Sequence, residues 1–93
     1  MFTTPRNNVI ESDEGFSVEV LGRTGLKYVE GDRTLKIDSE VLSPPSGMAV
    51  FTASIRTWEP PHAGEAVDSA AKARVIDNVR RAFKHRGFSI QVF

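Results

Sequence analysis

The feature that most constrains the fold of this chain is a hairpin motif at residues 26–37, where alternating apolar runs flank the dipeptide Gly31-Asp32. A two-residue loop of this kind requires a positive φ at its first central position, which glycine adopts without steric cost. Because the loop length fixes the register, three cross-strand pairs are expected: Glu30 with Arg33, Tyr28 with Leu35, and Leu26 with Ile37. A shift of one residue would expose Leu35 and Ile37, so this register is strongly favoured.

Further strands are predicted on both sides of the hairpin, because apolar and polar residues alternate there with a period of two. These strands cover residues 9–10, 16–20, 48–57 and 88–93. Proline pairs interrupt the pattern in the loop at residues 43–47 and again at Pro60-Pro61, since proline cannot donate to a sheet ladder. The alternation at residues 88–93 is so regular that we expect this last strand to pair inside the sheet.

The stretch from residue 68 to residue 86 has helical periodicity instead. Its apolar residues fall on one stripe of a helix: Val75, Ile76, Val79 and Phe83. Asp68 or Ser69 can cap the first turn, and Gly87 can end the helix in the left-handed conformation with Phe88 folding back on Phe83. The predicted element order is β-β-β-β-β-α-β. This order indicates an α+β fold, an antiparallel sheet of five to six strands with one C-terminal-half helix packed on one face.

Length and composition limit the classes of function. The 93 residues form one domain, residues 1–93, in which residues 1–8 can be disordered. The chain has no cysteine and its two histidines lack zinc-site spacing, so we expect no metal and no cofactor. No apolar run approaches the ~20 residues of a membrane span, and the first residues do not resemble a signal peptide. We therefore expect a cytoplasmic protein.

Charge is unevenly distributed although the net charge is zero. Residues 1–70 carry six Lys or Arg against eleven Asp or Glu, whereas residues 71–93 carry six Lys or Arg against one Asp. The densest basic run could contact nucleic-acid phosphates through Arg80, Arg81, Lys84 and Arg86. The same cations could instead offset the negative end of the helix dipole. Acidic residues near the sheet turns could steer a basic partner.

The segment from residue 54 to residue 62 contains the sole Trp, a Pro pair and one of the two His. Trp58 and Glu59 could form a recognition surface, because Trp presents a large area at low entropic cost. Alternatively, Trp58 could anchor a crossover that packs over the helix. Glu59 and His62 could form an acid–base pair, but no nucleophile accompanies them, so we predict that the protein is not an enzyme.

Several segments together resemble the bacterial polymorphic-toxin immunity proteins, specifically the family known as immunity protein 74. The matching segments are Gly22-Arg23-Thr24-Gly25-Leu26 with Tyr28 and Glu30-Gly31, Ser39-Glu40-Val41-Leu42, Ser54-Ile55 with Trp58 and Pro60-Pro61, and the helix ending at Gly87. Proteins of this kind are generally small cytoplasmic partners that bind a toxin domain tightly. The resemblance therefore implies protein binding without a cofactor and assigns no catalytic residue.

The resemblance also focuses the search for a binding surface, which we expect at the acidic turns and the loop around Trp58. The predicted partner-binding residues are Trp58, Glu59, Arg56, Tyr28, Asp32, Asp38 and Glu40. The aromatic residues and Arg56 would supply the binding hot spots, and the carboxylates would supply electrostatic steering. The alternative function is a small nucleic-acid-binding or regulatory domain that uses the basic helix end. An exposed edge strand would also leave homodimerisation open.

Overall fold

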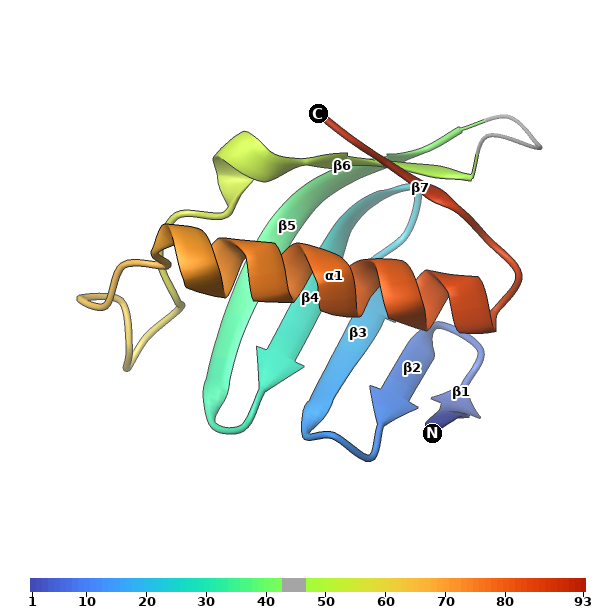
Figure 1. Ribbon diagram of the computed structural model, residues 1–93, viewed down its shortest axis with the longest axis horizontal. Helices are drawn as coiled ribbons and strands as arrows, with labels where there is room; N and C mark the ends of the chain where they lie inside the picture. Colours follow the sequence, from blue (N-terminus) through green and yellow to red (C-terminus); the bar gives the residue numbers. More distant parts are fainter. Residues whose placement is uncertain (43–46) are drawn as a thin grey trace.

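The computed structural model describes residues 1–42 and 47–93 (Figure 1). Within these residues the fold is α+β, as predicted, but the sheet has seven strands where five to six were expected. The elements are β1 (Phe2–Arg6), β2 (Val9–Ser12), β3 (Phe16–Val20), β4 (Thr24–Glu30), β5 (Arg33–Val41), β6 (Met48–Phe51), the 3-10 helix η1 (Thr52–Ser54), α1 (Ser69–His85) and β7 (Ile90–Val92). The predicted loop at residues 43–47 falls mostly on residues 43–46, which lie outside the described part.

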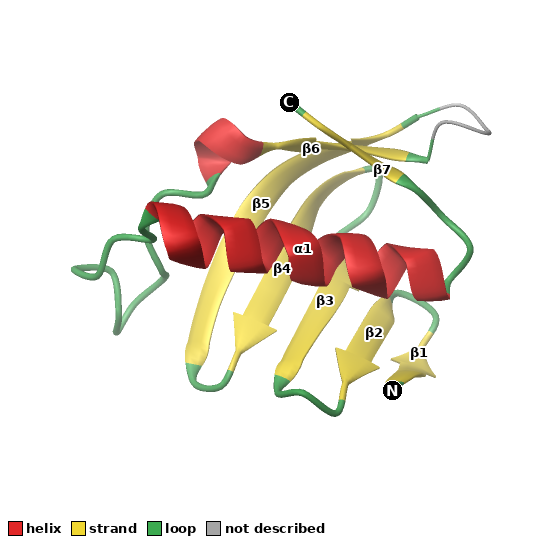
Figure 2. Cartoon of the chain, in the orientation of Figure 1, coloured by secondary structure: helices red, strands yellow, loops and turns green. Residues whose placement is uncertain are grey.

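The strands lie in the sheet in chain order, from β1 at one edge to β7 at the other. Neighbours from β1 to β6 are antiparallel, and α1 crosses one face of the sheet (Figures 1 and 2). The last strand was predicted to pair inside the sheet, and this is wrong: β7 is an edge strand and runs parallel to β6. The physical reason is that α1 acts as a crossover, which returns the chain in the direction of β6.

The hairpin of β4 and β5 confirms the predicted register, with Glu30 opposite Arg33, Tyr28 opposite Leu35 and Leu26 opposite Ile37. Gly31 has a φ of 62°, which is the positive value that the two-residue loop requires. One face of the hairpin is consequently apolar and lies under α1, where Leu26 and Leu35 are buried. The residues of the turn thus fix the register of β4 and β5 at the centre of the sheet.

The core lies between α1 and the sheet face that it covers (Figure 2). The helix contributes Val75, Val79, Ala82 and Phe83, and the central strands contribute Leu26, Tyr28, Leu35 and Ile37.

Both predicted ends of α1 are confirmed. The Asp68 carboxylate accepts a hydrogen bond from the Ala71 amide at 2.8 Å, and Gly87 follows the helix with a φ of 81°. Among the described residues, no helix combines the length and hydropathy that crossing a membrane requires.

Phe2–Arg6 form β1, within the segment 1–8 for which the sequence left disorder open. Tertiary contacts hold this strand. The Phe2 ring packs edge-on against Phe16 with centroids 5.9 Å apart, and it also lies 5.4 Å from the ring of His85. A short polar segment with one aromatic side chain carries little local signal, so its order depends on partners that are distant in sequence.

The strand predicted at residues 48–57 is also shorter than expected. β6 ends at Phe51 and the chain enters the 3-10 helix η1. Ser54 stabilises this turn, because its hydroxyl donates to the Phe51 carbonyl at 2.7 Å and accepts from the Asp38 amide at 2.9 Å. The predicted alternation fails as well, since Met48, Ala49 and Val50 are all buried. Met48 and Val50 belong to the core cluster, whereas Phe51 at the end of the strand is 37% exposed.

Trp58 belongs to the core, with 5% of its surface exposed. The chain around it folds back on itself. The Val67 amide donates to the Arg56 carbonyl at 2.8 Å, and Thr57 bridges Ala66. The structure therefore favours the anchored crossover over the recognition surface, and Trp58 is corrected from a partner-binding residue to a core residue.

Replacing Trp58 by Ala should cost about 3–5 kcal/mol of unfolding free energy, because it leaves a cavity under the loop. A loss of this size lowers the melting temperature of a domain of this length by more than about 10 °C. Thermal unfolding followed by circular dichroism would measure it. The exposed neighbour Thr57→Ala serves as the control and should change little; equal effects of the two substitutions would contradict the core assignment.

Candidate functional site

Tyr28 was predicted to contact a partner, but the structure corrects this, because its surface is fully buried under α1. The Tyr28 hydroxyl donates to Glu30 Oε2 at 2.7 Å and accepts from Asn78 Nδ2 at 2.9 Å. Burial raises the pKa of Tyr28 well above its ordinary value, so the hydroxyl keeps its proton and remains a donor. Tyr28 therefore joins the hairpin to the helix and takes no part in a binding surface.

Glu30 extends this network to the surface. Arg74 of α1 donates from Nε and Nη2 to the two carboxylate oxygens of Glu30, at 3.1 and 2.8 Å. Partial burial by itself would raise the pKa of Glu30, but hydrogen bonds from Arg74 and Tyr28 outweigh it, and the pKa lies below its ordinary value. The same bond raises the pKa of Arg74. A bidentate pair of this geometry also fixes the rotation of α1 on the sheet.

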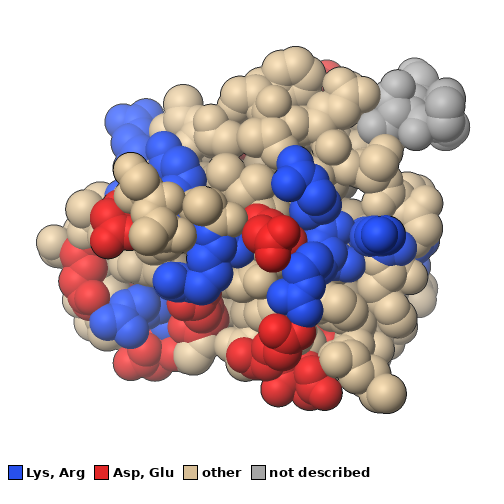
Figure 3. Space-filling model, in the orientation of Figure 1, with Lys and Arg blue, Asp and Glu red and all other residues tan. Residues whose placement is uncertain are grey.

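The four residues predicted to contact nucleic acid differ in their bonding within the protein. Arg81 forms an ion pair with Glu14 and donates to Asn78 Oδ1 at 3.4 Å, and Arg86 donates to the Asn7 carbonyl at 3.1 Å. Within the described residues, Arg80 and Lys84 have no such bond. Figure 3 shows the blue Lys and Arg atoms interleaved with red Asp and Glu atoms over this face. Two of the six Lys and Arg residues in the stretch 71–93, Arg74 and Arg81, are thus paired with carboxylates of the sheet and its turns.

The predicted acidic residues fall into two separate groups. Asp32 lies in the β4–β5 turn, and the Glu59 amide donates to the Thr34 carbonyl at 2.7 Å beside it. Asp38 and Glu40 are exposed near the other end of β5, on the face that α1 leaves open. At a rise of about 3.3 Å per residue, Asp38 lies roughly 20 Å from Asp32 along the strand. One continuous acidic patch is therefore excluded.

The group at the β4–β5 turn, which we call the acidic end, consists of Asp32, Glu59 and Glu65. The ring of His62 lies between two of these carboxylates, with Nδ1 2.6 Å from Glu65 and Nε2 3.3 Å from Asp32. Arg33 donates to Glu65 at 2.8 Å, and this bond, followed by that of His62, lowers the pKa of Glu65. The Glu65 carboxylate therefore stays ionised. The ring of His62 contacts Glu65 and Asp32, whereas the sequence had offered Glu59 as a possible partner.

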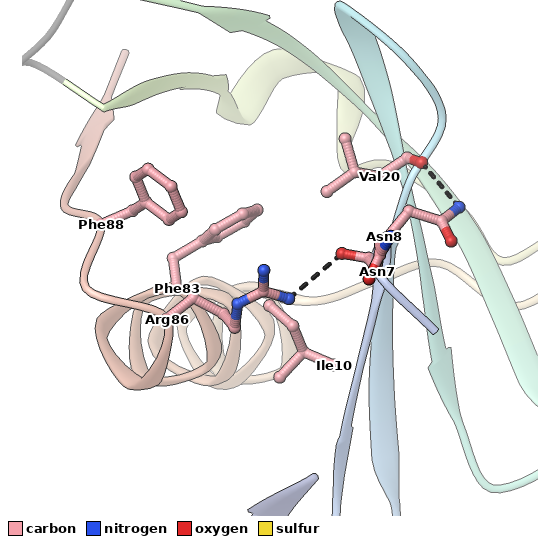
Figure 4. Close-up of a pocket in the computed structure, with 7 residues that line it drawn as sticks. All are labelled: Asn7, Asn8, Ile10, Val20, Phe83, Arg86 and Phe88. Carbon is pink, nitrogen blue, oxygen red and sulfur yellow. Dashed lines mark hydrogen bonds between the residues drawn. The ribbon is translucent and has the colours of Figure 1, made fainter. Parts of the chain in front are cut away.

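A pocket at the end of α1 was not predicted (Figure 4). We call it the helix-end pocket, and its lining consists of Asn7, Asn8, Ile10, Val20, Phe83, Arg86 and Phe88. An adjoining hollow shares Val20, Phe83 and Phe88 with it and continues to Val41 and Met48. Sequence reasoning missed this site because its walls come from three distant segments. The available signal was Phe88, an aromatic residue that follows a helix-ending glycine and is 53% exposed.

Arg56, the remaining predicted contact, is exposed, and its Nε donates to the Ala53 carbonyl at 3.0 Å. Its role in binding stays a prediction. In residues 1–42 and 47–93, no group of three or more His, Cys, Asp or Glu side chains is placed to hold a metal ion. The surface features of the described chain are therefore charged groups and an apolar pocket.

Fold and surface together define a small α+β domain with candidate contact sites at both ends of one helix. Comparison with protein-family models gives a match to Imm74, immunity protein 74, over residues 17–92. The chain belongs to this family, which confirms the resemblance found in the sequence. Comparisons with curated proteins and with solved structures gave no match.

The lowered pKa of Glu30 predicts a pH-dependent contribution to stability. A carboxyl group whose pKa falls on folding stabilises the protein above the unfolded value and loses this effect as pH drops through the folded value. The destabilisation caused by Glu30→Gln should therefore be largest near neutral pH and shrink below the ordinary pKa of 4.5. Urea unfolding from pH 7 to pH 3 would measure it, with the exposed Glu11→Gln as control. A pH-independent difference would contradict the assignment.

Proposed function

We propose that this protein binds a toxin domain and neutralises it by protein–protein association in the cytoplasm, without catalysis. The observation that carries the proposal is the immunity-protein family match over residues 17–92. Proteins of this class protect the producing cell by occupying the toxin. The buried positions of Tyr28 and Trp58 shift the binding role to other side chains.

In this proposal the acidic end attracts a basic surface of the toxin. The carboxylates of Asp32 and Glu65 lie on either side of the His62 ring, and the Asp32 side chain is 76% exposed. Arg33 and His62 hold Glu65 in place through the bonds described above, so this carboxylate is pre-organised. Exposed charges of one sign accelerate the encounter with an oppositely charged partner, and salt screens the effect.

Co-expression with the toxin domain encoded beside this gene tests the function directly. Growth should be rescued, and the two proteins should co-purify as a stable complex. Toxin expressed alone provides the control for toxicity, and circular dichroism confirms that the candidate is folded. Continued toxicity in the presence of the folded protein would overturn the proposal.

The acidic end can be tested separately by charge reversal. Asp32→Lys combined with Glu59→Lys should lower the association rate with the toxin about tenfold at low salt, because steering is lost. The matched control reverses Asp38 and Glu40, which carry the same charge at the other end of β5. Stopped-flow or surface-plasmon measurements across salt concentrations would separate the two pairs. Equal rates for both double variants would contradict a steering role for the acidic end.

A further inference from the structure

We propose that the helix-end pocket is the anchor site for the toxin, and that it takes an apolar side chain of the toxin flanked by a carboxylate. The inference rests on the proposed function and adds the chemistry of the contact. The contacts that contribute most of the affinity would then lie at the C-terminal end of α1, away from the acidic end.

The floor of the pocket is apolar and open to an incoming side chain. Phe83 is buried in the core and forms its base, whereas Phe88 is 53% exposed and stands beside it (Figure 4). Ile10 and Val20 complete the apolar lining from the sheet. Interface cores are enriched in aromatic residues, Met and Arg, and the adjoining hollow adds Met48 to this set. Apolar surface left exposed in this arrangement is typical of an interaction site.

The backbone around the pocket is held in place before any partner arrives. Gly87 turns the chain with its positive φ, and the Phe88 amide then donates to the Phe83 carbonyl at 2.9 Å. On the opposite wall, the Asn8 side chain donates to the Val20 carbonyl at 3.2 Å. Because these bonds are already formed, binding orders few additional groups, which reduces its entropic cost.

Charge complementarity identifies the flanking group of the partner. Arg86 is the one charged residue in the described lining, and its guanidinium donates a single bond at the rim, to the Asn7 carbonyl at 3.1 Å. A guanidinium has five N–H donors, so others remain for a carboxylate on the partner. Lys84 is exposed on the same turn of the helix and adds positive charge. An apolar residue next to Asp or Glu therefore fits both halves of the site.

The test compares Phe88→Ala and Arg86→Glu with two matched controls in binding to the toxin domain. Phe93→Ala removes another exposed aromatic ring, and Lys36→Glu reverses a charge on the open sheet face. We expect the pocket variants to raise the dissociation rate about 10- to 30-fold, as hot-spot truncations do. The controls should stay within about twofold of wild type. Since Phe88 is exposed, its replacement should leave the melting temperature nearly unchanged.

A second experiment identifies the carboxylate. In this experiment, Asp and Glu residues on the toxin are replaced by Arg one at a time. At one position the toxin variant should bind the Arg86→Glu protein more tightly than the unmodified toxin does, and it should bind the wild-type protein more weakly. Finding this exchange supports the proposed contact. Its absence at every acidic surface position of the toxin would overturn the carboxylate part.

The outcomes separate failure of the pocket from failure of the function. If the wild-type protein and Phe88→Ala bind the toxin equally well, the assignment of the helix-end pocket as anchor site is wrong and the proposed function stands. If folded wild type neither binds nor rescues, the proposed function fails, and this inference fails with it. Two further results would overturn the pocket alone: loss of self-association in Phe88→Ala with unchanged toxin binding, or loss of labelled nucleic-acid binding in Arg86→Glu with unchanged toxin binding.

Discussion

The hydrogen bond between Asn78 and Tyr28 is the contact on which the arrangement of the molecule depends. It crosses an otherwise apolar interface, and at 2.9 Å it joins the centre of α1 to the centre of the sheet. Unpaired polar groups in such a layer are costly, so the helix can slide or rotate only by breaking this bond. Glu30 and Arg74 extend the contact to the rim. Together these contacts fix how α1 lies on the sheet, and with it the place of the helix-end pocket.

Docking of α1 on the sheet also accounts for part of the unequal distribution of charge along the sequence. The acidic sheet and the basic helix neutralise one another through the pairs of Arg74 with Glu30 and Arg81 with Glu14. A basic helix can indicate a nucleic-acid surface, but here part of its charge serves docking. Cations beyond these pairs, notably Arg86 and Lys84, gather at the end of α1 beside apolar side chains. The charges that lie outside these ion pairs therefore determine the electrostatic character of the surface more than the net charge does.

The two candidate surfaces have complementary physical roles. Exposed carboxylates act over a distance comparable to the Debye length, about 8 Å at physiological ionic strength, and affect mainly how fast partners meet. An apolar pocket acts at contact and affects mainly how slowly they separate. The acidic end and the helix-end pocket lie at opposite ends of a helix of 17 residues, about 25 Å long. One partner lying along α1 could therefore use both, since a typical interface has similar dimensions.

The sequence by itself determined the features that depend on neighbouring residues. The Gly31 turn set the β4–β5 register, Asp68 and Gly87 set the ends of α1, and the change of hydrophobic period set the α+β class. Only the tertiary structure decided that β7 lies parallel at the edge, that Tyr28 and Trp58 are buried, and that a pocket forms at the end of α1. These features join segments far apart in the chain, such as Val20 and Phe83, and no local pattern encodes which distant partners a side chain will meet.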